Sequence, residues 1–258
     1  MKFCSLMSGS SGNCQFIESE GTKLLIDAGL SGKKAENLLK EIDIDASDID
    51  GILLTHEHSD HIKGAGVLSR RYDIPIYANE GTWIGIEDSI GKIRENNIKL
   101  IDREEFEIGN LGIRTFDLYH DCNQPLGFTF HRGEKKIGVL MDTGKVDQNI
   151  LNKIDSCDIL LIESNHDENL LKIGNYPIHL KKRIMGSWGH LSNDAAADII
   201  KEVSKKDNSI VVLGHLSKEN NFPELAYSTI DGALKSSGID EVKIKLSSRY
   251  FRTELFKL

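Results

Sequence analysis

Residues 55–61 read Thr-His-Glu-His-Ser-Asp-His, directly after the apolar run Gly-Ile-Leu-Leu of residues 51–54. Three histidines and an aspartate stand within six positions, although the whole chain of 258 residues holds only nine histidines. Imidazole and carboxylate groups are the ligands that first-row divalent metals prefer. In a loop at the end of a strand, we expect His56 and His58 to face one metal ion. Asp60 and His61 are then expected to turn toward a second ion.

One short segment cannot fill the coordination shells of two ions, so further ligands are expected at the ends of later strands. His120 follows Phe116 and Leu118 with a period of two, which puts all three on one face of a predicted strand. Asp142 ends the apolar run 137–141, and His215 ends the run 210–214. Each of these residues, taken alone, also suits an ordinary turn. Together they offer a third ligand for each ion and a shared carboxylate.

The composition is that of an ordinary soluble globular protein, with 39% hydrophobic and 28% charged residues. No apolar run approaches the roughly 20 residues that span a bilayer, so we expect no membrane segment. Lys2 precedes only a short apolar patch, which is not typical of a signal peptide, and we expect a cytoplasmic enzyme. The four cysteines form no Cys-x-x-Cys pair, and in a reducing compartment they are expected to be small buried hydrophobes.

The net charge of −8 argues against a general electrostatic binder of nucleic acid, which is usually basic. A nuclease that holds a short stretch of substrate at a locally positive site is still compatible with this charge. Two divalent ions carry about +4, and two aspartates and one hydroxide reduce this to roughly +1. Such a site attracts a singly negative electrophile. A phosphodiester fits, and so does a carboxylate-bearing lactam or thioester.

Strand and helix patterns alternate along the whole chain and predict a layered α/β protein. No Pro/Gly/Ser-rich linker interrupts the sequence, so we expect a single domain over residues 1–258. Ser31 and Ser192 stand in N-cap positions before helical runs. Strands are predicted at 2–6, 14–18, 23–27, 51–55, 75–78, 112–119, 126–131, 136–141, 158–163, 209–213, 242–246 and 249–256. Helices are predicted at 32–42, 62–72, 80–95, 147–154, 192–205 and 223–237.

The segment 56–61 resembles the His-x-His-x-Asp-His signature of the metallo-β-lactamase superfamily, and the later strand-end residues fall where its other motifs are expected. The resemblance implies a four-layer αββα sandwich with two divalent ions, Mn²⁺, Zn²⁺ or Fe²⁺. It further implies that one ion is held by His56, His58 and His120, and the other by Asp60, His61 and His215, with Asp142 bridging them.

One departure from the family pattern concerns the third motif. In related phosphodiesterases the third-motif histidine lies one residue nearer to a Gly-aromatic pair than His120 lies to the corresponding pair here, Gly127-Phe128. By that count Asp121 takes the position. Strand parity favours His120, and Asp121 stays open as an alternative ligand or as a residue supporting the site.

Three further stretches narrow the resemblance to the YycJ (WalJ) branch, which is similar to ribonuclease Z. They are residues 6–13, 163–167 and 189–193. The resemblance implies a 5′-to-3′ exonuclease that acts on double-stranded DNA, often with manganese, in DNA repair. It also implies that His190, in a Gly-His-Leu-Ser stretch similar to the Gly-His-Ser-Thr element of ribonuclease Z, handles a proton during catalysis.

Several residues are candidates for substrate binding, each with a plainer alternative. The loop 8–13 could cradle a phosphate with its backbone N–H groups or be a simple hairpin turn. His166 could line the substrate cleft or belong to a polar loop that starts a helix. The basic residues 181–183 could hold a nucleic-acid backbone or form a solvated helix face. The candidates are Ser8, Gly9, Ser10, Ser11, Gly12, Asn13, His166, Lys181, Lys182 and Arg183.

The residues and the resemblance together therefore predict hydrolysis of phosphodiesters in nucleic acid, with Asp60 orienting the attacking hydroxide and, by the resemblance, His190 donating a proton to the departing oxygen. One alternative is a hydrolase of small thioesters, lactams or cyclic phosphodiesters at the same two metals. Another is a binding protein that keeps the metal site without turnover, although the intact ligand set argues against it. Neither the native metal nor the oligomeric state can be read from the residues.

Overall fold

Two compact units make up the chain in the computed structural model, which describes residues 1–258. The first unit comprises Met1–Thr115, Cys122–Leu126 and Ser247–Leu258. The second unit comprises Phe116–Asp121 and Gly127–Leu246. The expectation of a single domain over residues 1–258 stays a prediction, and each unit is described by itself.

The sheet of the first unit has the strand order β14-β1-β2-β3-β4-β5-β6. Strands β1, β2 and β3 pair antiparallel, and β3 to β6 run parallel. Carboxyl ends of parallel strands meet at one edge of a sheet, so the loop that begins after β4 shares an edge with the residues that follow β3. The strands are β1 (Lys2–Met7), β2 (Cys14–Ser19), β3 (Thr22–Ile26), β4 (Gly51–Leu53), β5 (Ile76–Ala78), β6 (Ile98–Leu100) and β14 (Phe256–Lys257).

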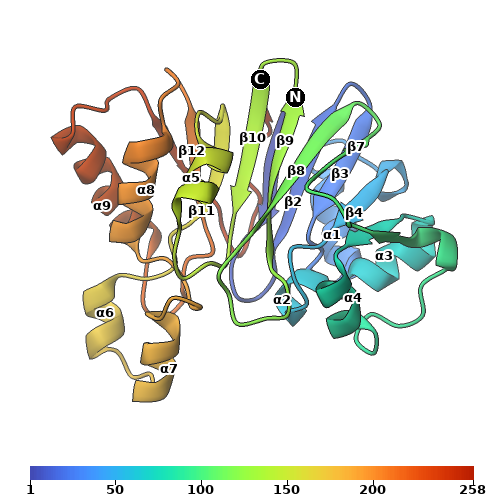
Figure 1. The fold of residues 1–258 in the computed structure, drawn as a ribbon, viewed down its shortest axis with the longest axis horizontal. Coiled ribbons are helices and arrows are strands. Elements are labelled where there is room, and N and C mark those ends of the chain that lie inside the picture. The colour runs from blue at the N-terminus through green and yellow to red at the C-terminus, as the bar shows by residue number, and fades with distance from the viewer. The chain divides into compact units, whose positions relative to one another are not determined.

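Helices pack an apolar core against one face of this sheet, and Figure 1 shows α1 and α3 beside its blue and cyan strands. The core includes Leu38 and Leu39 of α1 together with Ile52 and Ile76 of the sheet. Ser31 caps α1 as predicted, because its side chain accepts a hydrogen bond from the N–H of Lys34. The other elements of the unit are α1 (Gly32–Lys40), α2 (Ser59–Ile62), α3 (Ala65–Tyr72), α4 (Glu80–Ile86), the 3₁₀ turns Ala46–Asp48 and Glu95–Asn97, β7 (Glu105–Ile108) and most of β8 (Leu111–Asp117).

The sheet of the second unit contains β9 antiparallel to β10, followed by parallel β10, β11, β12 and β13. All five residues of β11 are buried, as is typical of a strand covered on both faces. Figure 1 shows α8 and α9 lying side by side, and Ser192 caps α8 as predicted. The elements are β9 (Leu126–Arg132), β10 (Lys135–Leu140), α5 (Gln148–Ile154), β11 (Ile159–Glu163), α6 (Glu168–Ile173), α7 (Ile178–Ile184), α8 (Asn193–Val203), β12 (Ile210–Gly214), α9 (Pro223–Ser236) and β13 (Lys243–Leu246).

Some predicted elements were wrong in extent. The helix predicted at 62–72 is divided into α2 and α3 at Gly64, whose N–H donates to Ala28 O at 2.7 Å. The helix predicted at 80–95 ends at Ile86, and the strand predicted at 249–256 is reduced to Phe256–Lys257. Four short elements, β6, β7, α6 and α7, were missed because they have too few residues to show a period.

No helix combines the length and the apolar character needed to cross a membrane.

The four cysteines form no disulfide, and three of them, Cys4, Cys14 and Cys157, are buried. Burial raises the pKa of the Cys4 and Cys14 thiols and raises that of Cys157 to about 12. Since the thiolate is the reactive form, these three thiols are expected to be inert in the folded protein. We expect a thiol reagent at pH 8 to modify one cysteine rapidly, the partly exposed Cys122, and the other three only after unfolding. Cys122→Ser should remove the fast phase, and two or more fast thiols in the native protein would contradict this packing.

Candidate metal centre

The loop after β4 brings its histidine rings together within the first unit. The ring centroids of His56 and His61 lie 4.1 Å apart, and those of His56 and His58 lie 4.7 Å apart. His56 Nε2 is 3.1 Å from His58 Nδ1, so two ring nitrogens point toward a common position. His56 and His61 are almost fully buried. With Asp60, these residues form what we call the first cluster: His56, His58, Asp60 and His61.

Asp27, the residue directly after β3, holds this cluster in place. Its carboxylate accepts hydrogen bonds from the Thr55 N–H at 2.9 Å and from the Thr55 hydroxyl, and lies 2.7 Å from His61 Nδ1. With Nδ1 engaged, His61 Nε2 is the atom available to a metal. The sequence analysis missed Asp27. Its signal was the one used for Asp142, because it too directly follows an apolar run.

The backbone of residues 27–29 lies directly against the backbone of the first cluster. The N–H of Ala28 donates to His61 O at 2.7 Å, and the N–H of Asn13 donates to Asp60 O at 2.8 Å. A Cβ atom at Gly29 would lie 1.6 Å from Asp60 O, a distance that no side chain can adopt. Glycine is therefore required at this position for the loop to close on the strand below it.

This close approach predicts a strong effect of the Gly29→Ala substitution. The added methyl must push Asp60 away, so we expect loss of metal binding at the first cluster and destabilisation by about 1–3 kcal/mol. Gly232→Ala in α9 is the matched control, because no atom lies within 4 Å of its added Cβ. Thermal unfolding and metal content measure both effects. Wild-type metal content in Gly29→Ala would show that the loop does not need this contact.

The predicted phosphate-binding loop 8–13 lies against the first cluster through Asn13. Asn13 Nδ2 is 3.1 Å from His61 Nε2 and donates to Asp60 Oδ2 at 3.4 Å. Gly12 has a φ of +150°, and a Cβ there would lie 2.6 Å from a Leu30 side-chain atom. The loop is therefore more specialised than a plain hairpin turn. Within it, Ser8, Gly9, Gly12 and Asn13 are buried, while Ser10 and Ser11 are exposed.

A second cluster forms in the second unit at the carboxyl ends of three adjacent strands. It consists of Asp142 after β10, Glu163 at the end of β11, His190 before α8, and His215 after β12; one ligand atom from each lies within 4.8 Å of the others. His215 Nδ1 is 2.7 Å from Asp142 Oδ1. Asp142 and His215 both have a φ of +53°, a left-handed conformation that is rare outside glycine and that often marks functional sites. The sequence analysis placed three of these four residues in the site.

Glu163 was missed as a site residue, although it lies at the centre of the second cluster. It is fully buried and its Oε1 lies 2.7 Å from His190 Nδ1 and 2.8 Å from His215 Nδ1. Burial raises the pKa of Glu163, but the charge of His190 and the hydrogen bonds from both histidines outweigh it and lower the pKa to about 2. Burial likewise lowers the pKa of His190, and the charge of Glu163 and a hydrogen bond to Asp142 outweigh it and raise the pKa to about 9.

His120 and Asp121, the two alternatives for the third motif, have different surroundings. The His120 side chain is 3% exposed and its Nδ1 is 3.2 Å from Gly189 O. Burial lowers the pKa of His120, which favours the neutral form that ligates metal. The Asp121 side chain is 32% exposed, and its carboxylate accepts a hydrogen bond from the Arg183 guanidinium. Asp121 thus pairs with one of the basic residues that were predicted to bind substrate.

The remaining predicted substrate residues also belong to the second unit. His166 is buried, its backbone forms a bridge with Ser192, and burial lowers its pKa. Lys181 and Lys182 lie on α7, a helix without buried residues, and Lys181 Nζ donates to Lys172 O at 2.7 Å. The basic segment is thus an exposed helix. An exposed helix is compatible both with binding of a nucleic-acid backbone and with a solvated helix face that has no binding role.

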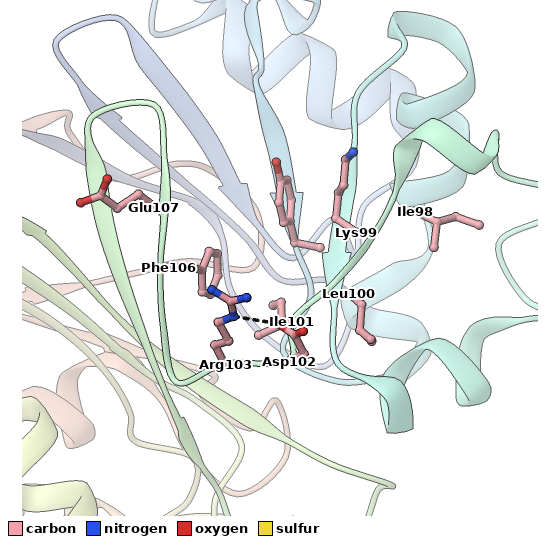
Figure 2. Close-up of a pocket in the computed structure, with 9 residues that line it drawn as sticks. Ile98, Lys99, Leu100, Ile101, Asp102, Arg103, Phe106 and Glu107 are labelled. Carbon is pink, nitrogen blue, oxygen red and sulfur yellow. Dashed lines mark ion pairs between the residues drawn. The ribbon is translucent and has the colours of Figure 1, made fainter.

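A hollow of about 320 Å³ in the first unit contains none of the predicted site residues. Figure 2 shows it beside the edge strand β6, with Phe106 and Arg103 on its wall. The cations Lys99 and Arg103 are balanced by Asp102 and Glu107, and Arg103 Nε lies 3.7 Å from Asp102 Oδ1. Its lining holds no histidine and no net charge, so it offers neither a metal site nor a strong site for an anion.

The chemistry of the donors fits divalent metal ions. Each cluster groups imidazole nitrogens and carboxylate oxygens in a largely buried place, and no lysine or arginine is among its members. Carboxylates behind the histidines, Asp27 in the first cluster and Glu163 in the second, fix the ring orientations, as supporting residues do in metal sites.

Comparison with known proteins agrees with this chemistry. A family model described as a β-lactamase superfamily domain matches residues 22–216. The chain belongs to the metallo-β-lactamase superfamily. It is 39% identical to the exodeoxyribonuclease YycJ of Bacillus anthracis over 239 residues, and 41% identical to the exodeoxyribonuclease WalJ of Streptococcus pneumoniae over 241 residues. Each match covers 92% of this chain and 90% of the relative, which confirms the predicted YycJ (WalJ) branch of the superfamily.

Solved structures confirm the predicted metallo-β-lactamase fold. The metallo-β-lactamase fold protein YhfI from Bacillus subtilis matches with a TM-score of 0.73 and 16% identity, over 98% of both chains. The short form of human tRNase Z matches with a TM-score of 0.66 and 18% identity, over the whole of both chains. At these identities the matches concern the fold alone. The superfamily membership and the relatives named exodeoxyribonucleases confirm the prediction of an enzyme, a metal-dependent hydrolase.

Proposed function

We propose that this hydrolase is a nuclease, a 5′-to-3′ exonuclease on double-stranded DNA that serves DNA repair in the cytoplasm. The observation that carries the proposal is the identity of 39–41%, over nine-tenths of both chains, to two relatives named exodeoxyribonucleases. Both clusters support it, since they provide the imidazoles and carboxylates that metal-assisted phosphodiester hydrolysis needs. Four cysteines that form no disulfide are compatible with a reducing compartment.

We further propose that the two clusters serve one dinuclear centre, with the ligands that the superfamily signature assigns. Asp142 would be the ligand shared by both ions, and His120 rather than Asp121 would be the third-motif ligand. The engagement of Asp121 with Arg183 and the burial of His120 support that choice. When bound, Mn²⁺, Zn²⁺ or Fe²⁺ supplies Lewis-acid stabilisation of the phosphoryl oxygens and activation of water. The proposed ligands are His56, His58 and His120 for one ion, and Asp60, His61 and His215 for the other.

In this proposal one side chain orients the attacking water and another donates a proton to the leaving group. Asp60, whose carboxylate accepts a hydrogen bond from Asn13 at 3.4 Å, accepts a hydrogen bond from the attacking water and orients it. His190 Nδ1 is held 2.7 Å from Glu163 Oε1, which leaves Nε2 to donate a proton to the departing oxygen. Such general acid catalysis typically contributes a factor of about 10²–10⁴ to the rate.

Substrate binding is proposed to rest on local features, because the chain as a whole carries a charge of −8. The loop 8–13 next to the first cluster is proposed to meet a phosphate through its exposed residues Ser10 and Ser11, since the N–H groups of its buried residues are bonded within the protein. His166 extends the polar lining near Glu163. Lys181 and Lys182 lie on the exposed α7 and can approach the nucleic-acid backbone, while Arg183 shares its charge with Asp121.

The decisive experiment incubates metal-reconstituted protein with end-labelled single- and double-stranded DNA and RNA, with manganese, zinc or iron. Mononucleotides released from the 5′ end of duplex DNA are the expected product. Release from the 3′ end, or from RNA alone, would contradict the finer specificity while leaving a nuclease. Turnover of nitrophenyl esters without cleavage of any polymer would instead favour the small-molecule hydrolase.

A further inference from the structure

The loop that precedes β14 exposes two adjacent aromatic side chains. Tyr250 is 70% exposed and Phe251 is 64% exposed, more than any other aromatic residue of the chain. The sequence pattern predicted a strand here, in which alternate residues would be buried, and the structure shows a loop instead. Large apolar rings left in water next to each other often mark a binding surface.

Hydrogen bonds hold this loop firmly on the first unit. The N–H of Ser8 donates to Ser248 O at 2.9 Å, and the N–H of Thr253 donates to Ser5 O at 2.9 Å, so both ends of the loop are attached to the region of β1. Arg252 reaches Glu41 and donates to its backbone oxygen at 2.9 Å. The folded structure therefore holds the two rings in water, and their exposure is not caused by a loose terminus.

The same loop is continuous with the first cluster. Ser8, which binds Ser248 through its backbone, donates from its hydroxyl to Asn13 Oδ1 at 3.1 Å. Asn13 Nδ2 in turn lies 3.1 Å from His61 Nε2. One short chain of hydrogen bonds thus connects the aromatic loop to a predicted metal ligand, and all of these residues belong to the first unit.

Cations flank the two rings in the sequence. Arg249 precedes them and Arg252 follows them, on a chain whose net charge is −8, and Arg252 is paired with Glu41. Exposed aromatic rings next to cations are the means by which proteins hold single-stranded nucleic acid without sequence preference, since every base has a face to stack. A neutral lipid or an apolar peptide would use the rings but not the cations.

We propose that Tyr250 and Phe251 form a stacking surface for the unpaired bases of a nucleic-acid strand that enters the first cluster. This inference rests on the proposed nuclease function and adds a site to it. The strand is bound here by its bases, whereas the loop 8–13 and the metals contact its phosphates. Substrates with unpaired terminal bases are therefore expected to bind more tightly than fully paired ends.

The test compares Tyr250→Ala/Phe251→Ala with the wild type and with Tyr227→Ala, a control at an exposed tyrosine on α9. Kd for a fluorescent oligothymidine is measured by anisotropy, and KM is measured for end-labelled DNA with a five-nucleotide unpaired end. Stacking is worth about 1–3 kcal/mol per base, so the double variant should raise Kd and KM about 10- to 100-fold. Hydrolysis of bis(4-nitrophenyl) phosphate, which has no base, should be unchanged. Tyr250→Trp/Phe251→Trp should restore binding.

Each failure has its own signature. If the double variant binds oligothymidine and digests DNA like the wild type, the stacking surface does not exist, although the nuclease does. If nitrophenyl phosphate turnover falls as much as DNA digestion, the loop supports the fold of the first cluster and not the bases, and the proposal is wrong. If the wild type neither binds nor cleaves any nucleic acid, the proposed function fails and the stacking surface fails with it.

Discussion

The His58→Ala variant should lose hydrolysis completely and should hold less metal than the wild type. His58 is only half-buried, and its Nδ1 lies 3.1 Å from His56 Nε2, so its removal deletes a ligand without opening a large cavity in the core. Removal of one ligand weakens metal binding strongly, because the remaining donors cannot fill the shell. Activity on DNA and metal content per chain, measured after chelation and reconstitution, are the two readouts.

His131→Ala is the matched control, since His131 is also half-buried but lies on β9, where its Nε2 is 2.9 Å from Thr129 Oγ1. That variant is expected to keep both activity and metal. Full activity of His58→Ala after chelation and metal replacement would overturn the assignment of the segment 56–61 as the metal-binding loop.

The His190→Ala variant should lower kcat for DNA by about 10²–10⁴-fold while metal content stays at the wild-type level. The reason is the position of His190, whose Nδ1 is held by Glu163, so that the ring is oriented for a proton transfer and not for ligation. The loss should be much smaller for bis(4-nitrophenyl) phosphate, because nitrophenolate departs without needing a proton.

Two results would contradict this role of His190. An equal loss on both substrates would show that the residue does not protonate the leaving oxygen. Loss of metal together with activity would make His190 a ligand, as its place among Asp142, Glu163 and His215 also allows. Glu163→Gln is a companion variant, and if Glu163 acts through His190 it should affect kcat more than KM.

The sequence predicted the candidate metal ligands better than the residues that hold those ligands in position. The spacing of His56, His58, Asp60 and His61 is dense enough to stand out from the composition. Asp27 carries the same signal as Asp142, a carboxylate at the end of an apolar strand, but nothing in the residues says which strand lies next to which. Only the parallel pairing of β3 with β4 puts Asp27 beside Thr55 and His61.

The long elements were predictable and the short ones were not, for a related reason. Helices such as α8 and α9 repeat an apolar pattern over several turns, and a cap such as Ser192 marks where α8 begins. Strand β6 has three exposed residues and therefore no burial pattern at all. The loop before β14 alternates like a strand, yet its ends are hydrogen-bonded to Ser5 and Ser8, and tertiary contacts override the local pattern.

The most direct test of the central claim is an anomalous diffraction measurement on crystals of the protein loaded with manganese. The proposal predicts two peaks a few ångströms apart (about 3.5–4 Å in two-metal enzymes). Residues of the first cluster should bind both ions, His120 one and His215 the other, with Asp142 between them. A single peak, or peaks that leave Asp142 and His215 without metal, would contradict the dinuclear centre on which the proposed chemistry depends.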